Sequence, residues 1–182
     1  MTVMFADIVS FTRMAGMLEP AQVFSLLNRL FSDFDALAEK HGLEKIKTIG
    51  DAYMVAGGLT AGQEGRCAAI AELALAMRDL TEREYSVNEQ ALQLRIGVAT
   101  GPVVAGVVGT KKFIYDLWGD TVNIASRLTS ESEPGRIQVD ERSYLLLSGD
   151  YEFEAPRTLN LKGKGYTTVL ELSRRIDKSL VS

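Results

Sequence analysis

The sequence contains few of the residues from which several common catalytic centres are built. It has one cysteine and one histidine in 182 residues. A single cysteine excludes an internal disulfide, and Cys67 lies in an apolar helical pattern, which favours a buried core position. The scarcity of histidine argues against zinc hydrolases and Ser-His-Asp triads. His41 directly precedes Gly42, so we expect it at a helix C-terminus rather than in a catalytic site.

The chain also lacks an excess of basic residues. Its formal net charge is −4, from 20 Lys and Arg against 24 Asp and Glu. A general nucleic-acid-binding domain would carry the opposite balance, so we expect no nucleic acid partner. The balance is compatible with one bound nucleotide, because a few well-placed cations suffice for a triphosphate.

Long apolar runs are missing as well. The longest apolar stretch, 68–77, is interrupted by Glu72 and is too short to cross a bilayer, and no signal peptide is recognisable. We therefore expect a cytoplasmic domain that makes no membrane contact. The abrupt start in a strand pattern indicates a piece of a longer protein. In that protein we expect regulatory domains outside this segment, and a membrane attachment there would leave this domain on the cytosolic side.

The hydrophobic pattern predicts one α+β domain. Apolar residues recur at three- and four-residue spacing after Pro20 and stop at Gly42, which is typical of an amphipathic helix with one buried stripe. An apolar strand ending at Asp7 precedes this helix, and the pair Gly50-Asp51 after it suits the tight turn of a hairpin with strands over 44–49 and 52–56. The order strand, helix, strand, strand, helix, strand is that of a ferredoxin-like βαββαβ core, with the first strand between the two later strands.

Additional strands and helices are expected on the C-terminal side of this core. The domain is predicted to cover 1–174, followed by a disordered tail over 175–182. The further predicted elements are a helix over 62–80, a loop over 81–90, strands over 92–99, 103–108 and 113–118, a helix over 121–128 capped by Asp120, a strand over 136–139, a helix over 141–147, and strands over 151–154, 158–161 and 168–172.

Two aspartates lie where carboxylates of neighbouring strands can meet. Asp7 ends a nearly pure apolar strand, and Asp51 lies at the tip of the hairpin. In a ferredoxin-like core these strand ends are adjacent, so the two carboxylates can share divalent cations, and Mg²⁺ usually takes one or two carboxylates plus substrate phosphates. The alternative is that Asp7 caps a helix and Asp51 is an ordinary turn residue.

Four segments carry a resemblance to a known family. They read FADIV at 5–9, EKIKTIGDAYM at 44–54, YDLWGDTVNIASRL at 115–128 and LKGKG at 161–165. In this order and spacing, from Phe5 to about Leu172, the sequence closely resembles the class III adenylate and guanylate cyclases. Four ordered segments are far more specific than a single glycine-rich motif.

The resemblance implies a metal site and a catalytic pair. Asp7 and Asp51 match the two metal-binding aspartates, with the carbonyl of Ile8 completing one site, and the implied cofactors are two divalent cations, Mg²⁺ or Mn²⁺. Asn123 and Arg127 match the pair that orients the ribose and stabilises the transition state. They are four residues apart on a predicted helix, so both side chains leave the same face, where a guanidinium can neutralise charge on the α-phosphate.

Phosphate and purine contacts are implied in the same way. Lys162 matches a lysine on the triphosphate, and Arg95 matches a phosphate-binding arginine. Lys47 and Asp116 match the pair that reads the purine. A carboxylate acceptor suits the adenine amino group and a lysine donor suits N1, whereas guanine requires the reverse polarity, with an acid at position 47 and a small or thiol residue at 116.

Each of these residues also has an ordinary structural interpretation. Arg127 could form a surface ion pair with Glu131, one helical turn later. Lys47 could pair with Glu44, and Lys162 could lie in a solvated turn.

The implied activity is that of an adenylate cyclase, which converts ATP to 3′,5′-cyclic AMP and pyrophosphate. Lys47 and Asp51 serve different active sites in the family, although only four residues separate them. One protomer supplies Asp7 and Asp51, and the other supplies Lys47, Asp116, Asn123, Arg127 and Lys162. Because this chain carries both sets, we expect a symmetric head-to-tail homodimer with ATP bound at the interface. The alternatives are a guanylate cyclase, a catalytically inactive nucleotide-binding dimerisation module, or an unrelated ferredoxin-like binding domain.

Overall fold

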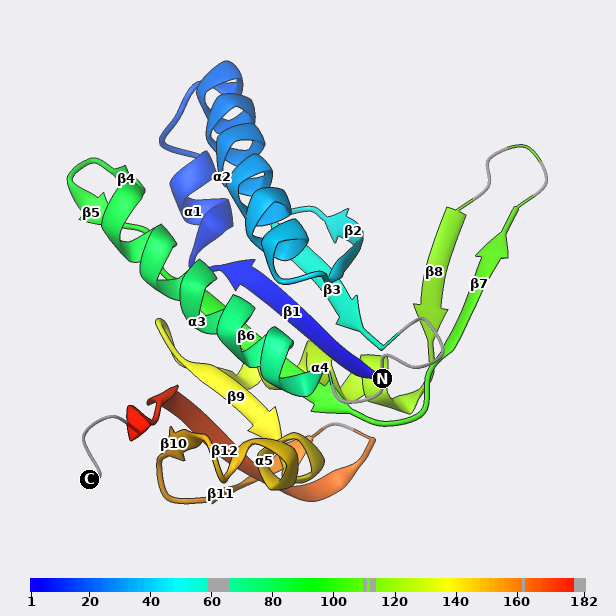
Figure 1. Cartoon of the computed structure of the whole chain (residues 1–182). Coiled ribbons are helices and arrows are strands. Elements are labelled where there is room, and N and C mark those ends of the chain that lie inside the picture. The colour runs from blue at the N-terminus through cyan, green and yellow to red at the C-terminus, as the bar shows by residue number, and fades with distance from the viewer. Residues whose placement is uncertain (59–65, 110, 112–113, 162, 179–182) are drawn as a thin grey trace.

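Strand β1 (Thr2–Ile8) lies in the middle of the main sheet, between β3 (Ala52–Gly57) and β6 (Leu94–Thr100). The computed structural model describes residues 1–58, 66–109, 111, 114–161 and 163–178, and Figure 1 shows the arrangement of its elements. Within these residues the main sheet has the order β10-β12-β9-β6-β1-β3-β2, with β11 paired to β12. The elements β1-α2-β2-β3-α3-β6 follow the predicted ferredoxin-like order, which confirms the α+β fold.

The other described elements surround this core or extend it. They are α1 (Phe11–Ala15), α2 (Pro20–Lys40), β2 (Glu44–Ile49), α3 (Cys67–Glu84), β4 (Ser86–Val87), β5 (Gln90–Ala91), β7 (Val104–Val108), β8 (Ile114–Trp118), α4 (Asp120–Glu131), β9 (Ile137–Asp140), α5 (Glu141–Leu147), β10 (Tyr151–Phe153), β11 (Arg157–Leu161) and β12 (Gly165–Arg175).

Helices cover both faces of the sheet. Because successive strand residues point to opposite faces, Met4 and Ile8 of β1 join the larger core cluster under α2 and α3, whereas Val3 and Phe5 pack in a second cluster with Ala125 of α4. Figure 1 shows α2 and α3 on one side of β1 and α4 on the other. The second cluster is the one that fixes α4, the helix that carries the predicted catalytic pair.

Helix α2 confirms the expected amphipathic pattern. Its start is stabilised by a capping box between Glu19 and Gln22, with Pro20 at the first helical position. Leu30, Phe34 and Ala38 are buried at four-residue spacing along one side.

Helix α4 lies unusually close to β6. A Cβ added to Gly97 would lie 2.4 Å from both the carbonyl oxygen of Ala125 and the backbone nitrogen of Thr129. Real Cβ atoms do not approach backbone this closely, so only glycine permits the contact. The hydroxyl of Thr129 also donates to the carbonyl of Phe5, at 3.3 Å, and so ties α4 to β1.

The loop predicted over 81–90 is wrong. Helix α3 continues to Glu84 because its inner face is still buried: Thr81 is fully buried and donates to the carbonyl of Met77, and the N–H of Tyr85 donates to Thr81. The strands β4 and β5 then form a two-residue hairpin whose turn residues, Asn88 and Glu89, have φ of 50° and 65°.

The predicted cap of α4 is also wrong. Gly119, with φ of 137°, occupies the N-cap position, and Asp120 is the first residue of the helix. The carboxylate of Asp120 therefore lies in the first turn, where it still interacts favourably with the helix dipole.

The C-terminal strand is longer than predicted. Strand β12 ends at Arg175, one residue beyond the expected domain boundary, and the N–H of Ile176 donates to the carbonyl of Asp150. Lys178 forms an ion pair with Asp150 at 2.5 Å. Positions 179–182 of the expected tail lie outside the described residues, so the boundary at 174 stays a prediction.

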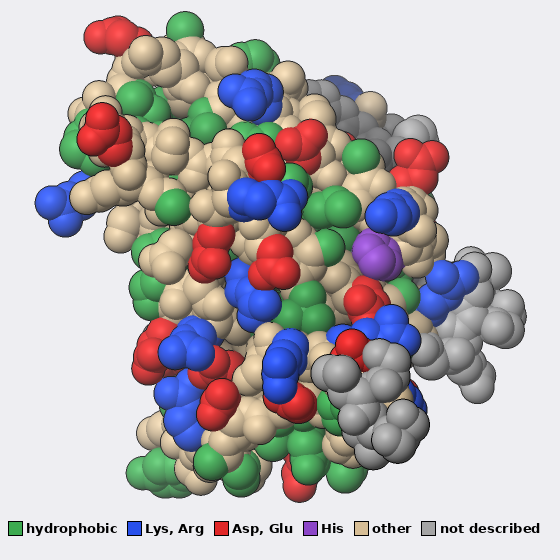
Figure 2. Space-filling model, turned by 60° about the vertical axis from the view of Figure 1, so that its left-hand side comes forward, with side chains coloured by type: hydrophobic (Ala, Val, Ile, Leu, Met, Phe, Trp, Pro, Cys, Tyr) green, Lys and Arg blue, Asp and Glu red, His purple; other side chains and the backbone are tan. Residues whose placement is uncertain are grey.

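Strands β7 and β8 form a separate two-stranded arm that projects from the body of the molecule (Figure 1). Val104, Val107, Val108 and Ile114 are each more than half exposed on this arm. Figure 2 shows Lys and Arg interspersed with Asp and Glu over the face drawn there. In the part of the chain that the structure describes, no helix has the length and apolar character needed to cross a membrane.

Candidate active site

Two carboxylates meet beside the centre of the sheet. Asp7 of β1 is in register with Ala52 of β3, so Asp51 in the hairpin turn lies next to it, as predicted. Burial raises the pKa of Asp7, the positive charge of Arg95 opposes this rise, and the negative charge of Asp51 adds to it. The two aspartates are therefore close enough to repel each other in a partly buried position.

Arg95 contacts the same carboxylate from the other side. It is the direct cross-strand partner of Asp7 in β6, and its Nη2 lies 3.2 Å from Asp7 Oδ2 and 3.5 Å from Oδ1. Its Nε is buried and has no hydrogen-bond partner among the described residues. Nη2 of the guanidinium is thus bound to Asp7, whereas the N–H group at Nε has no acceptor among the described residues.

The predicted catalytic pair lies on α4. Asn123 is exposed and Arg127 is partly buried, one turn later on the same helix. Nη1 of Arg127 is buried and has no hydrogen-bond partner in the described chain. The alternative ion pair between Arg127 and Glu131, both of which the structure describes, is not formed. An unpaired buried guanidinium donor is costly, and a phosphate oxygen would satisfy it.

The lysine-glycine turn between β11 and β12 lies against this arginine. Lys162, the predicted phosphate ligand, falls outside the described residues, but its neighbours are described. A Cβ added to Gly163 would lie 3.6 Å from Nη1 of Arg127. Lys164 forms an ion pair with Asp120 at the start of α4. The fold therefore brings together the segments 115–128 and 161–165, which are distant in sequence.

The predicted purine pair is in direct contact. Nζ of Lys47 on β2 lies 2.5 Å from Oδ2 of Asp116 on β8, and the two side chains keep 33% and 16% of their exposure. Burial raises the pKa of Asp116, but hydrogen bonds from Lys47 and from the N–H of Leu117, together with the charge of Lys47, lower it more. Asp116 is therefore an ionised acceptor, and the alternative partner of Lys47, Glu44, is not used.

Within one chain, the described residues of the two predicted sets are not joined by polar contacts. No hydrogen bond or ion pair links Asp7 or Asp51 to Lys47, Asn123 or Arg127 among these residues. Asp7 lies on β1 and Asp51 in the turn before β3, whereas Lys47 lies on β2, Asp116 on β8, and Asn123 and Arg127 on α4.

This geometry agrees with the comparison to known proteins. Residues 1–173 match the family described as the adenylate and guanylate cyclase catalytic domain. The chain belongs to this family. An adenylate cyclase of Mycobacterium tuberculosis (strain ATCC 25618 / H37Rv) is 45% identical over 164 residues, which are 90% of this chain and 37% of that protein.

Relatives named as guanylate cyclases are as similar to this chain as those named as adenylate cyclases. Guanylate cyclase 2G of Mus musculus is also 45% identical, over 176 residues that make up 94% of this chain and 16% of that protein. The guanylate cyclase domain of RhGC from Catenaria anguillulae, determined in complex with GTP, matches with a TM-score of 0.91 at 31% identity, covering 96% of both chains. Overall identity therefore does not select the purine. The chain spans well under half the length of these two curated relatives.

The family generally uses two metal ions, and the donors of this cyclase domain fit such ions. Asp7 and Asp51 offer hard carboxylate oxygens, and their mutual repulsion favours a cation between them. Nowhere in the described residues, this pair included, do three or more His, Cys, Asp or Glu form a group that could hold a metal ion, so further ligands would have to come from the backbone, water or substrate. Mg²⁺ commonly completes a set of one or two carboxylates with substrate phosphates and water, and these residues fit that type of site.

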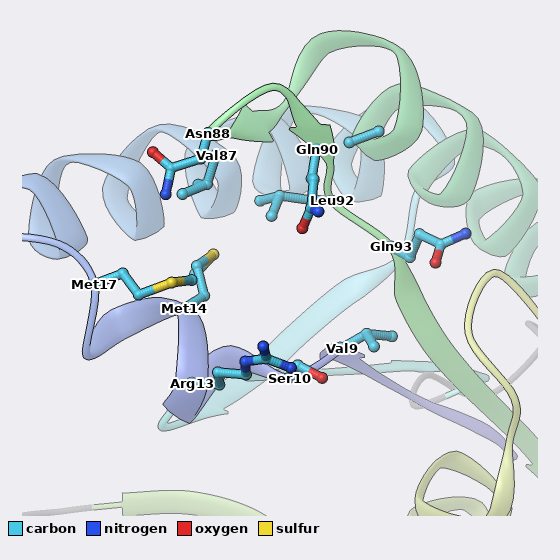
Figure 3. Close-up of a pocket in the computed structure, with 11 residues that line it drawn as sticks. Val9, Ser10, Arg13, Met14, Met17, Val87, Asn88, Gln90, Leu92 and Gln93 are labelled. Atoms are coloured by element: carbon cyan, nitrogen blue, oxygen red, sulfur yellow. The ribbon is translucent and has the colours of Figure 1, made fainter.

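A cavity of about 440 Å³ adjoins the metal-side segment of the cyclase domain. Figure 3 shows Met14 of α1 and Met17, just after that helix, on one side and Val87 and Leu92, around the β4–β5 hairpin, on the other. Its wall includes Val9, the residue after Ile8. None of the predicted site residues is among the described residues that line this cavity.

Sequence reasoning missed two contacts of the site. One is the pair formed by Arg95 and Asp7, and the other is the pair formed by Lys164 and Asp120. The alternation of lysine and glycine in the segment 161–165 indicated a turn there, but it did not reveal that Lys164 pairs with Asp120. Both contacts depend on how distant strands and helices meet.

Proposed function

We propose that this cyclase domain converts ATP to 3′,5′-cyclic AMP and pyrophosphate. The observation that carries the choice of ATP is the half-buried pair of Lys47 and Asp116. Adenine presents an amino donor at position six and an acceptor at N1, which suit a carboxylate and an ammonium group. Guanine presents the opposite polarity, and each mispaired group would cost about 1–3 kcal/mol. The similarity to a mycobacterial adenylate cyclase supports this choice.

In this proposal Asp7, Asp51 and the carbonyl of Ile8 hold two divalent cations, Mg²⁺ or Mn²⁺. When bound, such ions lower the pKa of the ribose 3′ hydroxyl and neutralise charge on the triphosphate. The register of β1 with β3 supports this set, because it places both carboxylates at one end of the sheet.

The remaining residues bind and orient the nucleotide. The ribose 3′ oxygen passes its proton to water or to a substrate phosphate oxygen and forms a bond to the α-phosphorus, while the bond between the α-phosphorus and pyrophosphate breaks. Arg127 donates from its unpaired Nη1 to the α-phosphate as negative charge builds up there, and Asn123 orients the ribose from the same helix face. Arg95 and Lys162 bind the outer phosphates. Positioning and charge neutralisation thus account for catalysis, with no covalent enzyme intermediate.

Two copies of the chain share each site in a head-to-tail homodimer. The lack of polar contact between the described residues of the two sets within one chain supports this arrangement. The arm of β7 and β8 adds support, because its exposed apolar residues, Val104, Val107 and Val108 among them, form a surface that an isolated protein would rarely leave uncovered. Because ATP is an intracellular substrate, we place the domain in the cytoplasm, under the control of regulatory domains elsewhere in the full-length protein.

The direct test uses purified protein with ATP or GTP and with Mg²⁺ or Mn²⁺, and identifies the products by chromatography. We expect cyclic AMP from ATP, and much slower turnover of GTP. A clear preference for GTP would identify a guanylate cyclase and refute the purine assignment. Nucleotide binding without turnover of either substrate, in a dimeric and metal-loaded protein, would indicate an inactive binding module.

A further inference from the structure

Arg95 contacts the carboxylate that the proposed function assigns to the divalent cations. Nη2 of Arg95 is within 3.5 Å of both carboxylate oxygens of Asp7, and the two residues are directly opposed on neighbouring antiparallel strands. Asp51 adds a second carboxylate nearby. The guanidinium of Arg95 thus places a positive charge directly against this pair of carboxylates.

The contact uses only one edge of the guanidinium. Nε of Arg95 is buried and unpaired among the described residues, although a guanidinium carries five N–H donors. Asp7 therefore leaves Arg95 incompletely satisfied. A second acceptor with several oxygens, such as a phosphate group, would offer it more hydrogen bonds than the aspartate does.

A divalent cation at Asp7 would share that carboxylate with the guanidinium of Arg95. Mg²⁺ binds carboxylate oxygens at about 2.0–2.1 Å, so a bound ion would be only a few ångströms from Nη2. Like charges at that separation in a partly buried site repel strongly. Arg95 in this position therefore weakens metal binding at Asp7 unless the guanidinium moves or an anion binds beside it.

We propose that Arg95 is an exchangeable counter-ion, which holds Asp7 in the nucleotide-free protein, competes there with the divalent cation, and transfers to the triphosphate when nucleotide and metal bind together. This inference rests on the proposed function, because it takes the metal site and the triphosphate from it. Its consequence is positive coupling: nucleotide strengthens metal binding, and metal strengthens nucleotide binding by the same factor.

The test measures Mn²⁺ binding to the complete, nucleotide-free protein by isothermal titration calorimetry. Arg95→Gln removes the competing charge and should bind Mn²⁺ about tenfold more tightly than the wild type or better. Arg95→Lys keeps the charge and should stay near the wild-type affinity. The matched control is Arg174→Gln, which removes another directly opposed cross-strand pair, Arg174 with Glu152, at the far edge of the sheet, and should change nothing.

A second titration adds 3′-deoxy-ATP, which lacks the attacking hydroxyl. It should tighten Mn²⁺ binding strongly in the wild type and much less in Arg95→Gln. Equal or weaker Mn²⁺ affinity in a folded Arg95→Gln, while the wild type still binds Mn²⁺ with nucleotide, would overturn this inference and leave the proposed function intact. Absence of Mn²⁺ binding to the wild type with or without nucleotide would overturn both.

Discussion

Replacing Lys47 by Glu and Asp116 by Cys reverses the hydrogen-bonding polarity of the purine pair. We expect this double variant to prefer GTP, whereas the wild type prefers ATP. The new carboxylate at position 47 would accept from the N–H group of guanine, and the thiol at position 116 would no longer demand an amino donor. Both side chains lie on strands, β2 and β8, so the backbone that presents them should remain in place.

The size of the effect follows from the burial of the pair. Lys47 and Asp116 keep only 33% and 16% of their side-chain exposure, so a mispaired purine cannot recover its lost hydrogen bonds fully from water. Each mispairing costs about 1–3 kcal/mol, or about 2–6 kcal/mol for two contacts. Since about 1.4 kcal/mol corresponds to tenfold, the ratio of kcat/KM for ATP to that for GTP should fall by at least about thirtyfold.

The assay is steady-state kinetics with both nucleotides, with cyclic products quantified separately. Lys45→Glu is a matched control, because Lys45 lies two residues earlier on β2 and pairs with Asp35 instead. It should leave the ratio unchanged. A double variant that keeps the wild-type ratio, or a Lys45→Glu variant that shifts it as much, would refute the assignment of Lys47 and Asp116 to the purine.

Two further predictions concern the fold around the site. Gly97→Ala should lower the free energy of unfolding in urea by about 1–3 kcal/mol and reduce activity, because the new Cβ would displace α4. Gly149→Ala is the control, because no atom lies within 4 Å of its added Cβ, and it should change neither quantity. Equal effects of the two substitutions would contradict the close packing of α4 on Gly97. The pKa of Asp116 is lowered from its ordinary 3.8, because Lys47 and the N–H of Leu117 outweigh the opposing effect of burial. Its ionised form therefore adds stability above about pH 4, which is lost as the pH falls through the lowered pKa. The difference in Tm between the wild type and Asp116→Asn should accordingly shrink between about pH 6 and about pH 2, and a difference that does not change with pH would count against an ionic contact.

Much of the core could be predicted because its signals are local. Helix α2 follows from the spacing of apolar residues between Pro20 and Gly42, and the hairpin of β2 and β3 follows from the Gly50-Asp51 turn. Once these elements are assigned to a ferredoxin-like order, the neighbouring positions of Asp7 and Asp51 follow from topology, and the register of β1 with β3 confirms them.

The errors arise where tertiary contacts override local preference. The polar residues 81–84 continue α3 because Thr81 is buried against the core, which no local pattern reveals. Asp120 is a good capping residue, but Gly119 takes the N-cap position with a φ that favours glycine. The pairing of Arg95 with Asp7 depends on the register of β1 with β6, which one sequence does not specify.

The measurement that tests the shared site most directly is the activity of mixed inactive variants. Asp7→Ala and Arg127→Ala should each be inactive alone, because each removes one residue from every site of the homodimer. After equal amounts are mixed and allowed to exchange subunits, half of the dimers should contain one of each, with one intact site. The mixture should then recover about a quarter of the wild-type activity. No recovery, with mixed dimers confirmed by mass spectrometry, would contradict a site built from two subunits.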